Sequence, residues 1–134
     1  MSAGYNADLT IKVKDEKGAI KALNAFIDAK GKGLEPFGPC NFHLAECKEK
    51  GIGRETLPDL ISIIMGGYQE PLKAEKVKDG FITYTKCFNA SYSWREVLDG
   101  MFEELAPFIE DGSSLDYDSD DYHAGWQIVG GEVC

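Results

Sequence analysis

Cysteine and histidine side chains at short spacing are the first candidates for chemistry in this sequence. Cys40, His43 and Cys47 are three and four residues apart, and Cys87 lies further along the chain. On a helix this spacing places the first three side chains on one face, and three thiolates with one imidazole form a tetrahedral ligand set for Zn²⁺. Leu44 shares that face, and free Cys is among the most commonly buried residue types, so a reduced, packed helix face also explains the spacing.

Acidic residues at alternate positions near the C-terminus are the second candidate. Asp116, Asp118 and Asp120 have the spacing that opens a calcium-binding loop. The position that requires Gly in such a loop is Asp121, however, and the position of the bidentate Glu is Gln127. We therefore expect the three carboxylates to face solvent on a hairpin rather than to bind Ca²⁺.

A glycine-containing stretch, residues 51–54, is the third candidate. Its backbone N–H groups can bind an anion in front of a helix, with Arg54 adding positive charge. The spacing matches neither the dinucleotide-binding nor the P-loop pattern, so we interpret the stretch as the lead into a helix. The two histidines, His43 and His123, lie in no hydrolase motif. We expect no catalytic residues and no cofactor.

The element predicted most clearly is a helix over residues 91–112. Ser93 followed three positions later by Glu96 predicts a capping box, Gly112 a stop, and Pro107 a kinked or tightened last turn. Eight apolar residues recur at spacings of three and four and predict one buried stripe: Trp94, Val97, Leu98, Met101, Phe102, Leu105, Phe108 and Ile109.

The N-terminal part of the chain predicts a strand followed by a helix. Apolar and polar residues alternate over 8–14, which is typical of a strand with one buried face. Asp15 is placed to cap the following helix, and Gly31 is placed to stop it. Residues 31–53 contain many Gly and Pro residues, so we interpret them as a connecting insertion.

Turn and cap residues define the remaining elements. Thr56 is placed to cap a short helix. Asp79-Gly80 lies between two strand patterns, 72–78 and 81–90, and this dipeptide is a strong hairpin signal because both positions favour positive φ. Alternation over 115–128 predicts a second hairpin that turns at 119–121.

This order of elements predicts an α+β fold in a single domain, residues 1–134. We expect a ferredoxin-like (split βαβ) antiparallel sheet with helices on one face, an inserted short helix and an extra C-terminal hairpin strand. No apolar run reaches the ~20 residues of a membrane helix, and the N-terminus has no secretory pattern. Cytoplasmic location is the resulting expectation.

The negative charge is concentrated in one part of the chain. The formal net charge is -9, and none of the 14 Lys and Arg residues lies after Arg95, whereas 11 of the 23 acids do. If the helix and the second hairpin are adjacent, their acids form one extended partner-binding surface. The residues expected on it are Glu96, Asp99, Glu103, Glu110, Asp116, Asp118, Asp120 and Asp121.

These observations favour a non-enzymatic inhibitor or adaptor that binds a basic, nucleic-acid-binding surface of another protein, as a monomer or homodimer. Direct binding to nucleic acid or to a membrane is disfavoured by the charge. Small inhibitors of the anti-CRISPR kind, encoded by phages and mobile elements, have this size and charge, which makes a nucleic-acid mimic one form of the hypothesis.

The alternative is a small enzyme or a ligand- or zinc-binding domain that uses Cys40, His43, Cys47 and Arg54, in a cleft between residues 31–53 and the sheet. A third reading is that the acids only solvate the surface.

Overall fold

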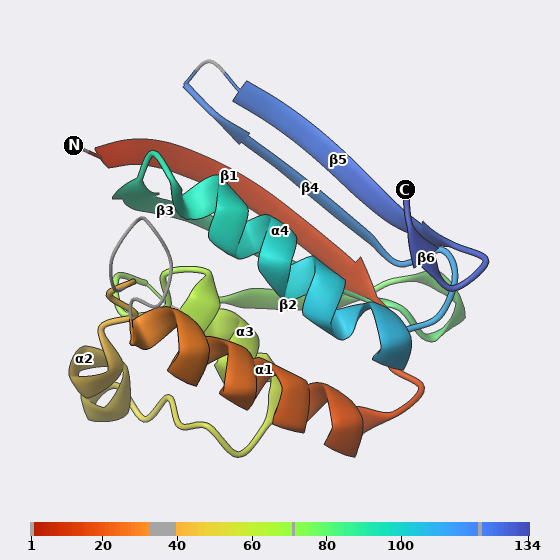
Figure 1. Cartoon of the computed structure of the whole chain (residues 1–134), viewed down its shortest axis with the longest axis horizontal. Coiled ribbons are helices and arrows are strands. Elements are labelled where there is room, and N and C mark those ends of the chain that lie inside the picture. Colours follow the sequence, from red (N-terminus) through yellow and green to blue (C-terminus); the bar gives the residue numbers. More distant parts are fainter. Residues whose placement is uncertain (1, 33–39, 71, 121) are drawn as a thin grey trace.

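The computed structural model describes residues 2–32, 40–70, 72–120 and 122–134. Helices cover one face of its sheet (Figure 1). Within these residues the fold is α+β, with four α-helices and a six-stranded antiparallel sheet in the order β2-β3-β1-β4-β5-β6. The strands are β1 (Ser2–Ile11), β2 (Lys73–Lys76), β3 (Ile82–Ser91), β4 (Ser114–Ser119), β5 (Tyr122–Val129) and β6 (Glu132–Val133). The helices are α1 (Glu16–Gly31), α2 (Leu44–Glu49), α3 (Leu57–Ile64) and α4 (Trp94–Leu105).

Strand β1 lies in the middle of the sheet and is paired on both sides. It pairs with β3 from Ser2 to Ile11 and with β4 from Asn6 to Thr10. Its side chains alternate between the two faces, and those on the helix-covered face are buried: Ala3, Tyr5, Ala7, Leu9 and Ile11. The side chains between them face the other side of the sheet, which no described helix covers.

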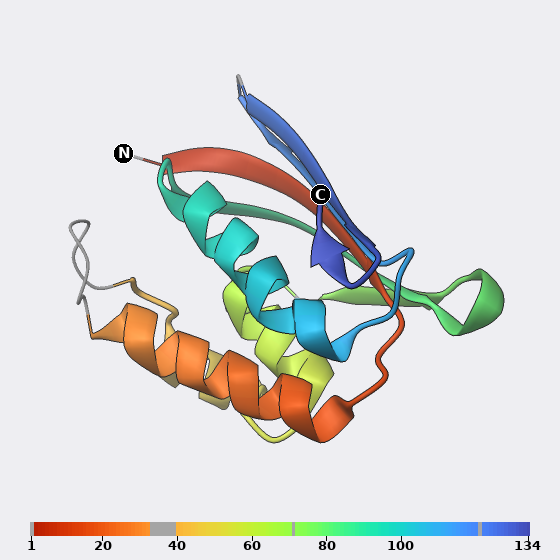
Figure 2. The same ribbon diagram turned by 45° about the vertical axis from the view of Figure 1, so that its right-hand side comes forward.

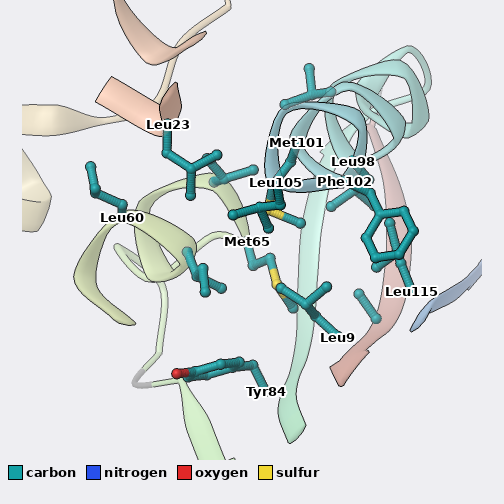
Figure 3. Packing of buried hydrophobic residues seen from close by; sticks show 14 of the residues in the cluster. Leu9, Leu23, Leu60, Met65, Tyr84, Leu98, Met101, Phe102, Leu105 and Leu115 are labelled. Carbon is teal, nitrogen blue, oxygen red and sulfur yellow. The ribbon is translucent and has the colours of Figure 1, made fainter. Parts of the chain in front are cut away.

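The core fills the space between the sheet and the helix layer. Helices α1, α3 and α4 lie on the same side of the sheet, and α1 packs against both α3 and α4 (Figure 2). Figure 3 shows Leu98 and Phe102 of α4 near Leu115 of β4, with Leu23 of α1 on the opposite side of the core. The prediction of a buried stripe on the 91–112 helix is confirmed within α4. The six stripe residues that lie in this helix are all buried: Trp94, Val97, Leu98, Met101, Phe102 and Leu105.

The ends of the 91–112 helix differ from the prediction. The α-helix spans only Trp94–Leu105, and a 3₁₀ turn containing Pro107 follows, so the expected tightening at Pro107 is confirmed. The prediction of a capping box at Ser93 is wrong. The Ser93 side chain makes no cap hydrogen bond, and its Oγ lies 3.1 Å from the Ser91 Oγ instead.

Four other local predictions are confirmed. Asp15 Oδ1 accepts the Gly18 N–H at 3.0 Å at the start of α1, and Thr56 Oγ1 accepts a backbone N–H in the first turn of α3. Asp79 and Gly80 have φ values of 63° and 85° in the turn between β2 and β3. Strands β4 and β5 form the expected second hairpin, in which Ser119 pairs with Tyr122; Asp121 of the expected turn lies outside the described residues.

The sequence missed part of the sheet. Strand β1 begins at Ser2, six residues before the predicted start, because Ala3, Gly4 and Ala7 give little hydrophobic contrast along the strand. Strand β6 was not predicted, since it contains two residues and is held by backbone hydrogen bonds to the end of β5. In the described part of the chain no helix is both long and apolar enough to cross a membrane.

We expect Phe102→Ala to lower the free energy of unfolding by ~3–5 kcal/mol, because it empties a fully buried position between α4 and the sheet. The neighbouring Glu103→Ala is the control, since Glu103 is exposed and its replacement should change stability by no more than ~0.5 kcal/mol. Chemical denaturation measures both values. Equal stability of the two variants would contradict the packing of α4 described above.

Candidate functional site

The four residues predicted as zinc ligands are not brought together. Helix α2 begins only at Leu44, so Cys40 and His43 precede it, and Cys47 is buried with its thiol donating to the Phe42 carbonyl. Cys87 points to the uncovered face of the sheet, away from the other three. Among the described residues, no group of three or more His, Cys, Asp and Glu side chains is arranged to hold a metal ion.

Arg54, the remaining residue of the alternative site, is committed to a structural role. Its guanidinium donates to the Asn24 side chain at 2.8 Å, to the Asn24 carbonyl at 3.0 Å and to Asp28 at 2.9 Å. The Asn24 amide donates in return to the Arg54 carbonyl. These contacts fix the loop before α3 to α1, so Arg54 serves to join two elements.

The uncovered face of β1, β4 and β5 carries a cluster of carboxylates. Asp8 lies directly opposite Asp116 in the register of β1 with β4, and Asp118 lies two residues further along β4, opposite Asn6. All three Asp residues are exposed. Among the described residues that face outward from these three strands, none is Lys or Arg. We call Asp8, Asp116 and Asp118 the acidic face.

Neighbouring residues direct the three carboxylates of the acidic face differently. The Thr85 hydroxyl donates to Asp8 at 2.9 Å, which draws Asp8 toward β3. Asp116 leans the other way, over Gly125 of β5: a Cβ added to Gly125 would lie 2.7 Å from the Asp116 Oδ1. The Asn6 amide donates to Asp118 at 3.1 Å. Asp8 and Asp116 thus diverge, which reduces the repulsion between opposite like charges.

The other predicted partner-binding acids lie elsewhere. Glu96 and Glu103 are exposed on α4, which packs on the covered side of the sheet, so they and the acidic face point to opposite sides. Glu110 pairs with Lys12 at 3.6 Å. Asp120 is exposed at the end of the β4–β5 hairpin, and Asp121 lies outside the described residues. Among the described residues, the helix and hairpin acids therefore do not form the single surface that was expected.

Asp99, a further member of the predicted set, fastens α4 to the β4–β5 hairpin. Its Oδ1 accepts the Tyr117 hydroxyl at 2.7 Å and the Trp126 indole N–H at 2.9 Å. Burial, together with the hydrogen bond to Asp99, holds the pKa of Tyr117 well above its usual range. This carboxylate satisfies two donors of the sheet and contributes to packing.

A pocket of about 350 Å³ lies on the covered side, where the insertion meets the end of β3. It is lined by residues 40–43, by Ile63, Gly66 and Tyr68 near the end of α3, by residues 88–91 of β3, and by Ser93 and Trp94 at the start of α4. Cys40 and His43 of the alternative hypothesis belong to this lining. Arg54 and Cys47 do not.

The chemistry of the pocket thiol disfavours nucleophilic catalysis. Burial raises the pKa of the Cys40 thiol, with Lys30 opposing the shift and Glu96 adding to it. A thiol nucleophile acts as the thiolate, which needs a lowered pKa. The imidazole of His43 is engaged as well, since its Nδ1 lies 2.7 Å from the Glu46 carboxylate and its ring stacks on Tyr68 at 3.7 Å between centroids.

Two features of the site region were missed by the sequence. Asp8 was used only to mark a strand, although it shares the outward positions of that strand with Asn6 and Thr10. Lys86 is only 3% exposed on the covered face of β3, where its Nζ donates to the Cys87 carbonyl at 3.3 Å and lies 3.9 Å from Glu70. Burial lowers the pKa of Lys86, and Glu70 opposes this shift. The alternation of Lys86 with the buried residues Tyr84 and Phe88 is the sequence signal that could have predicted its inward position.

Comparison of the chain with protein-family models, with curated proteins and with solved structures finds no match.

The raised pKa of Tyr117 predicts a loss of stability at high pH. Above pH ~10 the unfolded chain releases the tyrosine proton while the folded protein retains it, so the free energy of unfolding falls as pH rises. We expect Tyr117→Phe to reduce the slope of this decline. Tyr92→Phe is the matched control, because it removes the hydroxyl of a tyrosine that is 47% exposed. Denaturation at several pH values between 8 and 11 measures the slopes; equal slopes for both variants would refute this role of Tyr117.

Proposed function

We propose that this is a non-enzymatic binding protein whose acidic face engages a basic site on another protein. The observation that carries the proposal is the cluster of Asp8, Asp116 and Asp118 on a sheet face without outward Lys or Arg on β1, β4 and β5 in the described chain. Like charges directly opposite each other on neighbouring strands destabilise a sheet. A role in binding accounts for this arrangement, because the repulsion is relieved when a cationic partner arrives.

The shape of the acidic face supports contact with a partner. Asn6, Thr10 and Thr85 are short side chains around the carboxylates, and Gly125 has none. A partner's Lys or Arg can therefore approach Asp8 and Asp116 between short side chains, while Asp118 lies opposite the exposed His123. The carboxylates accept hydrogen bonds from neutral donors only, so each keeps its negative charge and further lone pairs for a cation.

The spacing of the charges favours a partner site that normally holds nucleic acid. Opposite residues on neighbouring strands are ~5 Å apart, and Asp116 and Asp118 are separated by ~7 Å along β4. DNA carries one phosphate per ~3.4 Å of helix axis on each strand, so three carboxylates within a few residues offer negative charge at a broadly comparable density over a short distance. We propose a mimic of a few phosphates, of the anti-defence kind found in anti-CRISPR proteins.

We also propose that β1 to β4 form a split βαβ arrangement of the ferredoxin-like type. Its support is that β3 lies between β1 and β2, that β1 lies between β3 and β4, and that these neighbours are antiparallel. The helical crossovers then lead from β1 to β2 and from β3 to β4, as in that topology. Strands β5 and β6 extend the sheet beyond β4.

The test is neutralisation of the acidic face. We expect the triple variant Asp8→Asn, Asp116→Asn, Asp118→Asn to remain folded and to bind the partner at least ~10-fold more weakly, because each Asn keeps the shape and removes the charge. The partner is first captured by crosslinking to the wild type, then purified and titrated against each variant. Wild-type binding should weaken steeply as salt increases and should compete with duplex DNA for the partner.

The control is a variant with the same change of charge on the other side of the sheet. Glu96→Gln, Glu103→Gln, Glu104→Gln removes three exposed acids from α4 and should leave affinity within about threefold of the wild type. Equal losses in the two triple variants would mean that only net charge matters. Binding that is insensitive to salt would also refute the proposal.

A substitution at Gly125 tests the position of one carboxylate without changing charge. We expect Gly125→Ser to weaken partner binding several-fold, because the new Cβ would lie 2.7 Å from the Asp116 Oδ1 and must displace it. Gly53→Ser is the matched control, since a Cβ there has nothing within 4 Å. The measurement is the same titration, with circular dichroism to check the fold. Unchanged affinity in Gly125→Ser would show that Asp116 does not contact the partner.

A further inference from the structure

The pocket between residues 40–43 and the end of β3 contains several aromatic rings that other contacts hold in place. The Trp94 indole N–H donates to the Ile64 carbonyl at 2.9 Å, and Phe42 packs edge-on against Trp94 at 5.4 Å between centroids. Phe88 stacks on Tyr5 at 5.4 Å and 16°. Rings fixed in this way lose little freedom when a ligand binds, so the walls are preorganised.

The described part of the lining offers no ammonium, guanidinium or carboxylate partner to a charged ligand. None of the described residues that line the pocket is Lys, Arg, Asp or Glu. A full charge moved from water into such a site would lose hydration without gaining an ionic partner, which is strongly unfavourable. A neutral ligand with a flat apolar surface, by contrast, gains contact with the Phe42, Phe88 and Trp94 rings.

Two hydroxyl protons at the pocket are available to a ligand. The Ser91 and Ser93 hydroxyls lie 3.1 Å apart and share one hydrogen bond, which leaves one of their two protons for another acceptor. The Tyr68 hydroxyl accepts the Gln69 side-chain N–H at 2.7 Å, so its own proton also remains to be donated. Ser93 is free for this role because it does not cap α4.

From these observations we propose that the pocket binds a small, uncharged, planar heteroaromatic molecule that presents hydrogen-bond acceptors to Ser93 and Tyr68. The volume of about 350 Å³ lies near the lower limit for small-molecule sites and fits one or two fused rings. The site lies on the covered side of the sheet and goes beyond the binding role of the acidic face. It is independent of that role.

Caffeine is a suitable probe, because it is neutral, planar and bicyclic and carries acceptors but no N–H or O–H donor. We expect a titration followed by ¹H–¹⁵N NMR to give saturable shifts at the Trp94 indole N–H and at the amides of residues 88–94, with a Kd on the order of 1 mM for a ligand of this size. Benzoate, a planar anion, and cyclohexanol, a neutral molecule without a flat ring, should each bind at least several-fold more weakly.

Two single-hydroxyl deletions form a matched pair for the same titration. Tyr68→Phe keeps the ring that stacks on His43 and removes the donor, so it should weaken caffeine binding about fivefold or more. Tyr92→Phe removes a hydroxyl from a neighbouring residue that does not line the pocket and should leave the Kd unchanged. The acidic-face triple variant should also bind caffeine as the wild type does, which separates failure of this proposal from failure of the protein-binding role.

Three results would overturn the inference. The first is the absence of saturable shifts up to the solubility limit of caffeine. The second is benzoate binding as tightly as caffeine, which would contradict the exclusion of charge. The third is an equal Kd for Tyr68→Phe and Tyr92→Phe, because the acceptor contact at Tyr68 would then not exist.

Discussion

The position of β1 at the centre of the sheet is the constraint on which the rest of the structure depends. Its pairing with β3 and β4 fixes the register of three strands, and its alternation decides which side chains enter the core. Tyr5 and Leu9 are buried under the helices, while Asn6 and Asp8 face the uncovered side. A slip of one residue would exchange the two sets and bury Asp8, so the core and the acidic face are specified by the same register.

The helix layer separates the negative charge of the C-terminal third into two surfaces. Helix α4 must turn its apolar stripe toward the sheet, so its exposed acids point away from the acidic face. Asp99 lies at the border and is used to hold Tyr117 and Trp126. Acids that are concentrated in one part of the sequence therefore do not form one surface here, because strands and helices direct neighbouring residues to different sides of the molecule.

The sequence predicts structural features that depend on residues close together in the chain. It does not predict features that depend on contacts between distant segments. The caps at Asp15 and Thr56 and the Asp79-Gly80 turn follow from local backbone chemistry, and all are present. Ser93 has an equally good local signal, yet its hydroxyl pairs with Ser91, because the end of β3 reaches the start of α4. The zinc hypothesis needed a helix that included Cys40, and α2 begins later. The divergence of Asp8 and Asp116 could not be predicted, since it depends on Thr85 and Gly125 from two other strands.

Strand β3 places the pocket and the acidic face back to back. Phe88 faces the pocket, while Thr85 on the opposite face holds Asp8. The two sites are linked through β3 and through Tyr5 of β1, which stacks on Phe88, and β3 is paired with β1 over its whole length and with β2 over part of it. A small molecule that contacts ring faces does not alter those hydrogen bonds. Binding at the two sites should therefore be close to energetically additive, and any coupling between them would have to come from a change in the pairing of β1 with β3 or in the stack of Phe88 on Tyr5.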